Sequence, residues 1–413
     1  DDPRSAPAYA GALSKDISLW NAIGKTRTLS MKLSSEEQTP HDIMHVINVP
    51  DRISLPRILQ EGGLTIADGS TWHLWVNRVS PDNDFALERL RICSEFVQAR
   101  NAAMGKSYSR NPIAVLASET SSQRQKVEGK SNCFNPKSVD NAALALQDAR
   151  FGVDVINEHI LLSSGQDYRV VVIPSNQQEV LPQTVDFLKA FVEAGGKLLV
   201  MGSGMQHAQG RARDIEALLG LKRTGIAGGA HSLDINGKTA SFNYAMNIEI
   251  GDAELLASCT NNRAFLTQRR FGKGVAAYVS AAAPIPYPDD SGLLSWAMKT
   301  LGVTPWVQVQ SGDDDKHLVY SFRSKPGRLL LHVVNVTSHV DGKRVEPDVS
   351  QDIDPVAVIP ELTLKLKLPA RPEAVSLLPA TGRVEYDWND GALDLRITNV
   401  DYHAVVEMAI DGY

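Results

Sequence analysis

Acidic residues follow two segments in the first hundred residues that alternate between apolar and polar side chains, as strands do. Glu36 and Glu37 come after segment 26–33, and Asp51 comes after segment 42–49. A carboxyl group can donate a proton, accept one or attack as a nucleophile, depending on its surroundings. Glu36 and Glu37 are therefore candidate catalytic residues, and Asp51 is a candidate for binding a hydroxyl group. The alternatives are solvated loop charges for the glutamates and an ordinary surface ion pair for Asp51.

An aromatic segment, 71–76 (TWHLWV), supplies a second set of candidates. Trp72 and Trp75 are three residues apart, so they face opposite sides of a strand. His73 and Asn77 fall on the same side as Trp75 and could bind hydroxyl groups, while Trp75 could stack on a ring. A role in the core or at its rim is equally consistent with these residues.

The elements that would position these candidates alternate in type. Segments 26–33, 42–49 and 71–76 predict strands, whereas 56–66 and 84–103 have the apolar spacing of amphipathic helices. Strands separated by helices are typical of an α/β fold with parallel strands. Three strands are too few for an independent sheet of this length.

The next region, 111–304, is organised around a strand, a helix and a second strand. Val170–Ile173 is a branched-aliphatic run, 181–192 has helical spacing, and Lys197–Met201 is apolar again. Such a succession within about 35 residues predicts a parallel β-α-β unit with a right-handed crossover. Segment 118–130 predicts a polar loop, and 264–280 predicts a hairpin. The region as a whole predicts a doubly wound domain.

Three enzymatic hypotheses for this doubly wound domain fail on its residues. A nucleophilic Cys in a strand-to-helix turn is missing, because Gly202-Ser203-Gly204 occupies that position. Met201 breaks the G-x-S-x-G spacing of a serine hydrolase, and the third glycine of a dinucleotide-binding loop is missing. The sequence therefore favours a packing role for this domain.

The last region, 305–413, changes texture after Pro305. Seven short alternating runs are separated by turn residues and show almost no helical spacing. This pattern predicts an antiparallel β-sandwich. The domain prediction is therefore 1–110, 111–304 and 305–413.

Composition limits the partners. The chain has 413 residues and a formal net charge of -6, which argues against a nucleic-acid or anionic-membrane partner. No apolar run reaches about 18 residues, the length that spans a bilayer. The three cysteines show no CxxC pair, and no histidine spacing suggests a metal, so we expect neither a metal nor a cofactor.

The order of the parts resembles a known family of glycoside hydrolases. Asp68-Gly69 followed by TWHLWVN, and a helix ending in FVQAR, resemble the last strand and helix of their (β/α)8 barrel. The segments YRVVVIP, FVEAGGKLLVMG and RRFGKGVAAYVS resemble the glutamine-amidotransferase-like domain of family 42 β-galactosidases and related α-L-fucosidases, where it is called the trimerisation domain. A small β-domain at the C-terminus completes that order.

The resemblance implies hydrolysis of a glycosidic bond by a pair of carboxylates, with no metal or organic cofactor. The strand ends that would face an oligo- or polysaccharide carry Glu36 and Glu37, either of which could supply the acid or the nucleophile, and Asp51, His73, Trp75 and Asn77 as sugar-binding residues. Part of the catalytic pair could lie on another chain. A barrel needs about 250 residues, so we expect a second chain or a homo-oligomer to complete it.

Two other classes of function stay open. One is a non-catalytic carbohydrate-binding or assembly protein derived from such a hydrolase, and the other is a small-molecule hydrolase or transferase that uses the doubly wound domain. The chain begins at Asp1, so either a leader has been removed or this is part of a longer polypeptide. A periplasmic or secreted location is favoured over the cytoplasm.

Overall fold

The computed structural model describes residues 31–32, 44–48, 55–67, 71–75, 84–100, 102–103, 107–127, 136–282, 289, 291–310, 318–337, 339–340, 343–344 and 355–411. These residues fall into two compact units. Unit 1 combines the described parts of 36–110 and 306–413, and unit 2 combines those of 31–35 and 111–305. The mixed α/β class predicted from the sequence is confirmed. The three-way domain division stays a prediction.

Unit 2 is built on an eight-stranded sheet with the order β1-β6-β5-β7-β8-β13-β12-β11. From β1 to β13 in this order, neighbouring strands are parallel. Strand β12 is antiparallel to β13, and β11 is antiparallel to β12. The strands are β1 Met31–Lys32, β5 Ile113–Leu116, β6 Val153–Ile156, β7 Val170–Ile173, β8 Lys197–Met201, β11 Glu254–Cys259, β12 Arg263–Phe271 and β13 Gly274–Val279. A separate hairpin joins β9 Leu221–Ile235 to β10 Lys238–Ile250.

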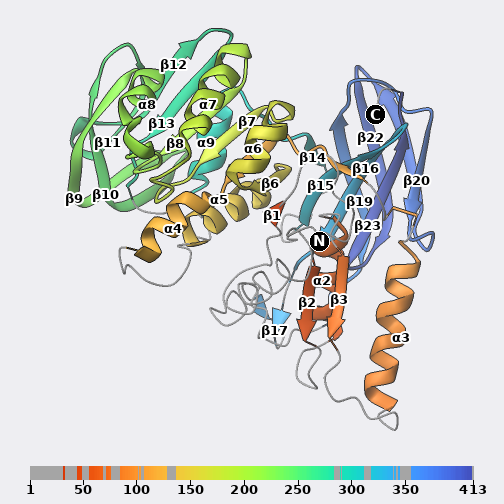
Figure 1. Cartoon of the computed structure of the whole chain (residues 1–413). Coiled ribbons are helices and arrows are strands. Elements are labelled where there is room, and N and C mark those ends of the chain that lie inside the picture. The colour runs from red at the N-terminus through yellow and green to blue at the C-terminus, as the bar shows by residue number, and fades with distance from the viewer. Residues whose placement is uncertain are drawn as a thin grey trace, which may run out of the picture. The chain divides into compact units, whose positions relative to one another are not determined.

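Helices surround the strands of unit 2 (Figure 1). They are α4 Glu119–Val127, α5 Pro136–Asp148, α6 Glu158–Ser164, α7 Pro182–Ala194, α8 Ala212–Leu219 and α9 Leu293–Thr300. The central β-α-β prediction is confirmed, since β7 and β8 are parallel, with Val170 opposite Lys197, and α7 joins them. All four residues of β7 are buried, as expected for a strand covered on both faces. Gly195 ends α7 with a φ of 123°, a value that glycine adopts without strain.

One local prediction in unit 2 is wrong. Segment 118–130 was expected to be a polar loop, but Glu119–Val127 forms helix α4. Ser118 stands just before the helix, and its Oγ accepts a hydrogen bond from the N–H of Ser121 at 3.0 Å. This N-cap satisfies one of the free donors of the first turn, which is why a strongly polar segment becomes helical here.

Unit 1 contains two antiparallel sheets, with the orders β14-β19-β22-β21 and β20-β23-β16-β15-β4. Their strands are β4 Tyr108–Ser109, β14 Val307–Val309, β15 Leu318–Lys325, β16 Arg328–Asn335, β19 Ile359–Lys367, β20 Ala374–Leu378, β21 Val384–Asn389, β22 Ala392–Val400 and β23 His403–Ala409. A two-residue pair, β17 His339–Val340 and β18 Lys343–Arg344, lies apart. Side chains of both sheets share one apolar core that includes Phe322, Leu331, Leu364 and Leu395. We call these two sheets the two-sheet body.

The remaining part of unit 1 is β2 Met44–Asn48, α2 Leu55–Ala67, β3 Thr71–Trp75 and α3 Asp84–Gln98. Strands β2 and β3 are parallel, with Asn48 opposite Trp75, so the predicted strand, helix and strand are present. Helix α2 packs on β15, β16 and β23. The contact places Leu64 and Ala67 of α2 against Val334 of β16. The five-stranded sheet is therefore covered on both faces.

The first predicted strand does not lie where the sequence suggested. Segment 26–33 was expected to stand beside the other two strands of a barrel end. Its described part, β1, instead pairs in parallel with β6, with Met31 opposite Val155. A two-residue strand carries too little pattern to specify its partner, and a free parallel edge of the large sheet supplies one.

Candidate functional site

Most of the candidate residues chosen from the sequence lie outside the described residues. This holds for Glu36, Glu37, Asp51 and Asn77. His73 and Trp75 lie on β3, for which the backbone is described. The strand that precedes Glu36 pairs with β6, as described above.

The carboxyl ends of β2 and β3 meet at one edge. Asn48 is the last residue of β2 and lies opposite Trp75, the last residue of β3. Because the two strands are parallel and in this register, the chain leaves both of them on the same side. In α/β folds this is the edge at which ligands bind.

Unit 2 has a second edge of this kind. Strand β5 lies between β6 and β7, so the chain runs from β5 to one side for β6 and to the other for β7. Ligands in doubly wound folds bind outside the carboxyl ends of the strands at such a switch point. The residues that leave β5, β6 and β7 here are Ser118, Glu158 and the segment 174–179.

The switch point of unit 2 is occupied by the protein's own polar groups. The Oγ of Ser118 donates to Glu158 Oε1 or to the carbonyl oxygen of Glu179, each at 2.6 Å. The second oxygen of Glu158 accepts from the N–H of Glu119 at 2.9 Å, and the N–H of Ser118 donates to Gln177 Oε1 at 2.7 Å. Glu158 is 1% exposed. The Glu158 carboxylate therefore accepts hydrogen bonds from Ser118 and Glu119, which follow β5 at the position where a ligand would bind.

Glu179 is held in the same way. One carboxylate oxygen pairs with Arg124 and the other accepts from the N–H of Gln209 at 2.8 Å. Its backbone N–H donates to the Oγ of Ser121 at 2.7 Å. Both buried carboxylates are thus committed to helix starts and loops, which leaves neither as a free acid or base.

The turn after β8 is equally occupied. Gly202 has a φ of 49°, and a Cβ there would lie 2.3 Å from the carbonyl oxygen of Ala281. Its own carbonyl oxygen accepts from Tyr278 Oη at 2.7 Å, and Arg223 Nη1 donates to the oxygen of Gly204 at 2.7 Å. Only glycine fits the first position, so this turn is built for packing.

Ser203 lies at the tip of that turn and is 3% exposed. Its Oγ accepts from the N–H of Asn176 at 3.1 Å and from Gln178 Nε2 at 3.4 Å. Neither of these partners can take up a proton from the hydroxyl group, so the activated serine of a hydrolase is not assembled here.

Sequence reasoning missed Ser118, Glu158 and Glu179 as a group. A signal existed: Ser118 and Glu158 each come within two residues of the end of an apolar strand. Among the residues that the structure describes, no cluster of three or more His, Cys, Asp or Glu could hold a metal ion. No helix within the described ranges is long and apolar enough to cross a membrane.

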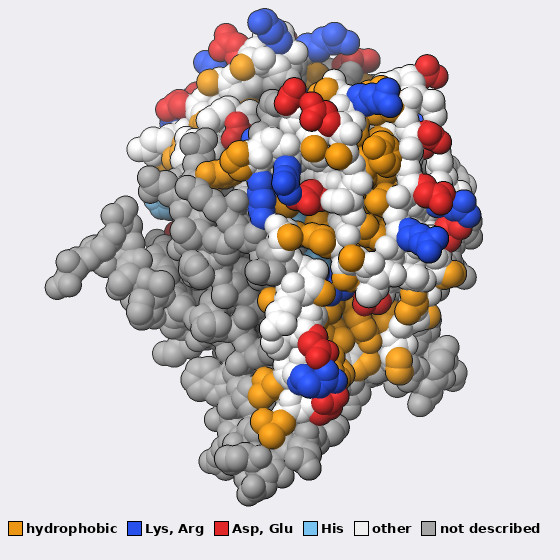
Figure 2. All heavy atoms as spheres, turned by 90° about the vertical axis from the view of Figure 1, so that its right-hand side faces the viewer, with side chains coloured by type: hydrophobic (Ala, Val, Ile, Leu, Met, Phe, Trp, Pro, Cys, Tyr) orange, Lys and Arg blue, Asp and Glu red, His pale blue; other side chains and the backbone are white. Residues whose placement is uncertain are grey.

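Surface charge is mixed on the face that Figure 2 shows. Basic and acidic side chains alternate over it, and neither sign forms a continuous field. A polyanion such as nucleic acid calls for a basic patch. The expectation that nucleic acid is not a partner stays a prediction.

Comparison with known families finds one match, which lies within unit 2. Residues 114–287 match the family model described as "Beta-galactosidase trimerisation domain". Residues 114–287 are thus similar to that domain, and we call them the trimerisation-type domain after this description. The resemblance to family 42 glycoside hydrolases is thereby confirmed, and a search of curated proteins finds no match to the chain.

Solved structures share the fold of more than the trimerisation-type domain. An α-L-fucosidase (isoenzyme 2) from Paenibacillus thiaminolyticus is 16% identical, with a TM-score of 0.62 over 87% of this chain and 58% of that one. A β-galactosidase from Bacillus circulans sp. alkalophilus is 16% identical, with a TM-score of 0.59 over 94% and 56%. Gan42B, a GH42 β-galactosidase from G. stearothermophilus, is 15% identical, with a TM-score of 0.57 over 86% and 51%.

These structures extend well beyond the present sequence. The chain spans between 51% and 58% of their lengths. At 15–16% identity the likeness concerns the fold.

Proposed function

We propose that this chain is a subunit or fragment of a glycoside hydrolase of the α-L-fucosidase or β-galactosidase type. The observation that carries the proposal is the family match of residues 114–287, combined with fold likeness over 86–94% of the chain. The solved structures that share this fold are described as β-galactosidases and an α-L-fucosidase.

In this proposal β2, α2 and β3 are the end of a (β/α)8 barrel. Their parallel register and the helix between them are what such a barrel requires. The carboxyl-end edge, where Asn48 lies opposite Trp75, faces the sugar. In this proposal Asp51, His73, Trp75 and Asn77 bind hydroxyl groups and the sugar ring. Trp75 ends β3 and His73 lies two residues before it, while Asp51 and Asn77 follow β2 and β3 in the sequence.

Glu36 and Glu37 are the candidates in this chain for one of the two catalytic carboxylates, as acid or nucleophile. A glycosidase needs two carboxylates about 5–5.5 Å apart for retention and farther apart for inversion. Two adjacent residues on one loop can supply one member of such a pair more easily than both. The proposal therefore includes a second carboxylate from the chain that completes the barrel.

A partner for β2 and β3 is part of the proposal. Two parallel strands and their helices cannot form a closed barrel, and an open parallel edge binds further strands readily. A second polypeptide that carries the missing strands, a homo-oligomer, or both would supply them. The trimerisation-type domain supports assembly into an oligomer.

Release of nitrophenol from nitrophenyl α-L-fucoside and β-D-galactoside tests the activity. We expect Glu36→Gln or Glu37→Gln to lower turnover about 10²- to 10⁴-fold, the range for loss of a general acid or base. Glu95→Gln is the matched control, because Glu95 is exposed on α3. Unchanged turnover in both test variants would remove these residues from the site, and no turnover with any glycoside, alone or with co-expressed upstream sequence, would refute the hydrolase.

The second candidate is a non-catalytic carbohydrate-binding or assembly protein. The closed switch point of the trimerisation-type domain favours it, since Ser118, Glu158 and Glu179 are all used internally. It predicts sugar binding or oligomer formation without bond cleavage. Retained binding of a labelled oligosaccharide with no product release would distinguish it from the hydrolase.

A further inference from the structure

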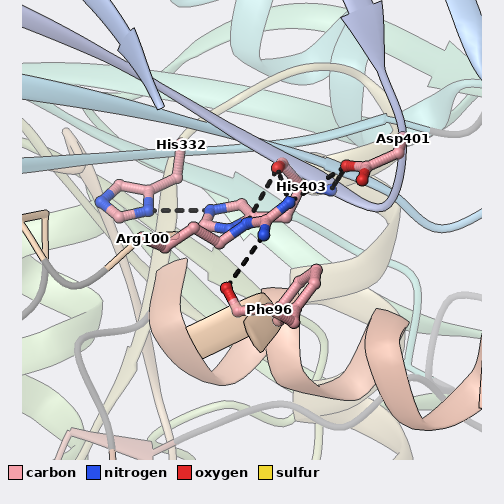
Figure 3. A network of polar contacts seen from close by, with 5 residues as sticks. All are labelled: Phe96, Arg100, His332, Asp401 and His403. Carbon is pink, nitrogen blue, oxygen red and sulfur yellow. Dashed lines mark hydrogen bonds and ion pairs between the residues drawn. The ribbon is translucent and has the colours of Figure 1, made fainter. Parts of the chain in front are cut away.

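A buried polar cluster joins the end of α3 to the two-sheet body (Figure 3). Arg100 is 2% exposed, and its Nε and Nη2 donate to the carbonyl oxygen of His403 at 3.1 and 2.6 Å. Its Nη1 donates to the oxygen of Phe96 at 3.0 Å, and Nη2 also pairs with Asp401 at 3.1 Å. The guanidinium carbon lies 3.6 Å from the centre of the Phe96 ring. The cation is therefore satisfied and fixes the backbone at the start of β23.

Two histidines lie next to this cation with no polar partner besides each other. His332 of β16 and His403 of β23 are 0% exposed, and their rings stack with centroids 5.3 Å apart. Nδ1 of His332 is 3.1 Å from Nε2 of His403, so one nitrogen donates and the other accepts. The other two nitrogens, Nε2 of His332 and Nδ1 of His403, have no hydrogen-bond partner among the residues that the structure describes.

The neutral pair is the only form that this site can accommodate at low cost. In either tautomer one N–H and one lone pair stay unsatisfied, which is tolerable for uncharged groups. A proton added to the pair creates a buried cation without an acceptor, and a second one breaks the hydrogen bond between the rings. Burying an unpaired charge costs far more than burying a neutral ring.

Helix α2 seals the pair from solvent. A Cβ added at Gly63 of α2 would lie 2.9 Å from the Cβ of His403 and 3.2 Å from Cγ1 of Val334. The backbone of α2 therefore rests directly on β23 and β16. Gln60 of α2 holds the same contact, since its Nε2 donates to the oxygens of Asn335 and Thr337 at 3.2 and 2.9 Å.

The surrounding charges oppose a further cation. From β15, Arg323 donates to Ser107 and Lys325 donates to the oxygen of Ala102. The side chains of α2 that the structure describes carry no titratable group. The charged groups that act on the two rings are Arg100, at the end of α3, and Arg323 and Lys325 of β15. The other described titratable groups on α3, β15, β16, β23 and the β22–β23 turn are Glu88, Arg89, Arg91, Cys93, Glu95, Tyr320, Arg328, Asp401, Tyr402 and Glu407. The carboxylates among them are engaged: Asp401 pairs with Arg100, Glu407 with Arg328, and Glu88 and Glu95 with Arg91.

We propose that His332 and His403 form an acid-sensitive switch, which holds α2 and the end of α3 on the two-sheet body while both rings are neutral and releases them when either ring is protonated. The proposal rests on geometry: the two rings are stacked and buried under α2, and two of their nitrogens have no partner among the described residues. The switch does not depend on the proposed hydrolase activity, because it needs only the packing within unit 1.

The direction of the pH dependence follows from the two pKa values. Burial lowers the pKa of His332 to about 3, with Arg323 and Lys325 lowering it further. Burial also lowers the pKa of His403 well below its usual value, and His332 and Arg100 add to this effect. Once α2 is released, both rings return to a pKa of about 6.5, so the open state binds more protons below that pH. The closed state is thus fully favoured above pH 6.5 and loses about 30-fold per histidine at pH 5.

Hydrogen exchange on the full chain at pH 7.5 and pH 5.0 tests the switch, with rates corrected for intrinsic chemical exchange. We expect the protection of the α2 amides to fall about 30-fold or more at pH 5, while α7 in unit 2 keeps its protection. Equal protection of α2 at both pH values would overturn the proposal.

Variants separate the two histidines from general acid effects. His332→Leu should reduce the loss of α2 protection, whereas His159→Gln, at an exposed position on α6, should leave it as in the wild type. Because His332→Leu could impair folding, the Cε1 resonances of the wild-type histidines provide an independent measurement. Neither His332 nor His403 should titrate near pH 6.5 in the closed state, and an ordinary titration of either ring would refute the switch.

Discussion

At the scale of single residues, Gly63 shows how a missing side chain decides a contact. A Cβ added at Gly63 would lie 2.9 Å from the Cβ of His403, so there is no room for a methyl group unless α2 moves away from the sheet. We expect Gly63→Ala to lower the free energy of unfolding of unit 1 by about 1–3 kcal/mol, the usual cost of overpacking. Urea unfolding followed by tryptophan fluorescence measures this loss.

The control for Gly63→Ala is Gly228→Ala in β9. At Gly228 the nearest heavy atom to an added Cβ is Tyr244 Cε1 at 4.0 Å, so the methyl group has space. Its effect should stay within about 0.5 kcal/mol. Equal losses in the two variants would show that the close approach of α2 to β23 is not what limits position 63.

Glu158 provides a second prediction for a single residue. Both of its carboxylate oxygens accept hydrogen bonds, one of them from the backbone N–H of Glu119. Glu158→Gln places an NH₂ group against one of these donors, so we expect a loss of about 1–3 kcal/mol in the stability of unit 2. Thermal unfolding of Glu158→Gln and of a control, Glu193→Gln, checks this. Glu193 is exposed on α7, so its substitution should leave the midpoint unchanged.

The sequence indicates some of these residues and cannot indicate others. Glu36, Glu37 and Asp51 were chosen because each follows a predicted strand, which is local information. Arg100 and His403 are 303 positions apart, and they meet only because α3 ends on β23. No spacing rule relates two residues at that separation, so the cluster becomes visible only in three dimensions.

At the scale of elements, the buried face of α2 determines how β2, α2, β3 and α3 of unit 1 pack together. Ile58 is 0% exposed and belongs to a cluster with Leu59, Ile66, Cys93 and Phe96, which joins α2 to α3. We expect Ile58→Ala to cost about 2–5 kcal/mol, the range for deleting a large aliphatic side chain in a core. Chemical denaturation measures it. Leu87→Ala, on the exposed part of α3 at 44% exposure, should cost far less, and a similar cost would contradict the assigned packing.

Elements with strong periodicity were predictable and those held by distant contacts were not. Val170–Ile173, α7 and Lys197–Met201 carry their own signals, namely a branched-aliphatic run, a 3.6-residue period and Gly195. Helix α4 carries almost none, because its side chains are mostly polar and its first turn is stabilised by the cap at Ser118, which accepts from the backbone N–H of Ser121. Strand β4, only Tyr108–Ser109, exists because β15 offers its edge to these residues.

At the scale of the whole molecule, the two units differ at the carboxyl ends of their parallel strands. In unit 1 the parallel strands β2 and β3 end on the same side, and α2 packs on the two-sheet body. Unit 2 keeps the topology of a ligand-binding fold but fills the switch point with Ser118, Glu158 and Glu179. Because the switch point is filled, we look for contacts with other molecules on the outer surface of unit 2.

The hairpin β9–β10 is the part of that surface where assembly should be tested. Ile226 is 57% exposed and Tyr244 is 52% exposed. Tyr244 pairs with Gly228 and Met246 with Ile226, so Tyr244 and Ile226 share a face of the hairpin with Met246, which is buried in the core of unit 2. Exposed large apolar side chains favour contact with another protein, and the homo-oligomer proposed above makes a second copy of this chain the partner to test.

Ile226→Glu combined with Tyr244→Glu should therefore convert an oligomer into monomers, because two charges would be buried without partners in the contact. Light scattering after size-exclusion chromatography measures the mass of each particle, and we expect about a twofold to threefold decrease for a dimer or trimer. Leu87→Glu, on an exposed position of α3, is the control and should leave the mass unchanged. A double variant that keeps the wild-type mass would place the assembly surface elsewhere on the chain, and a monomeric wild type would remove the homo-oligomer from the proposed function.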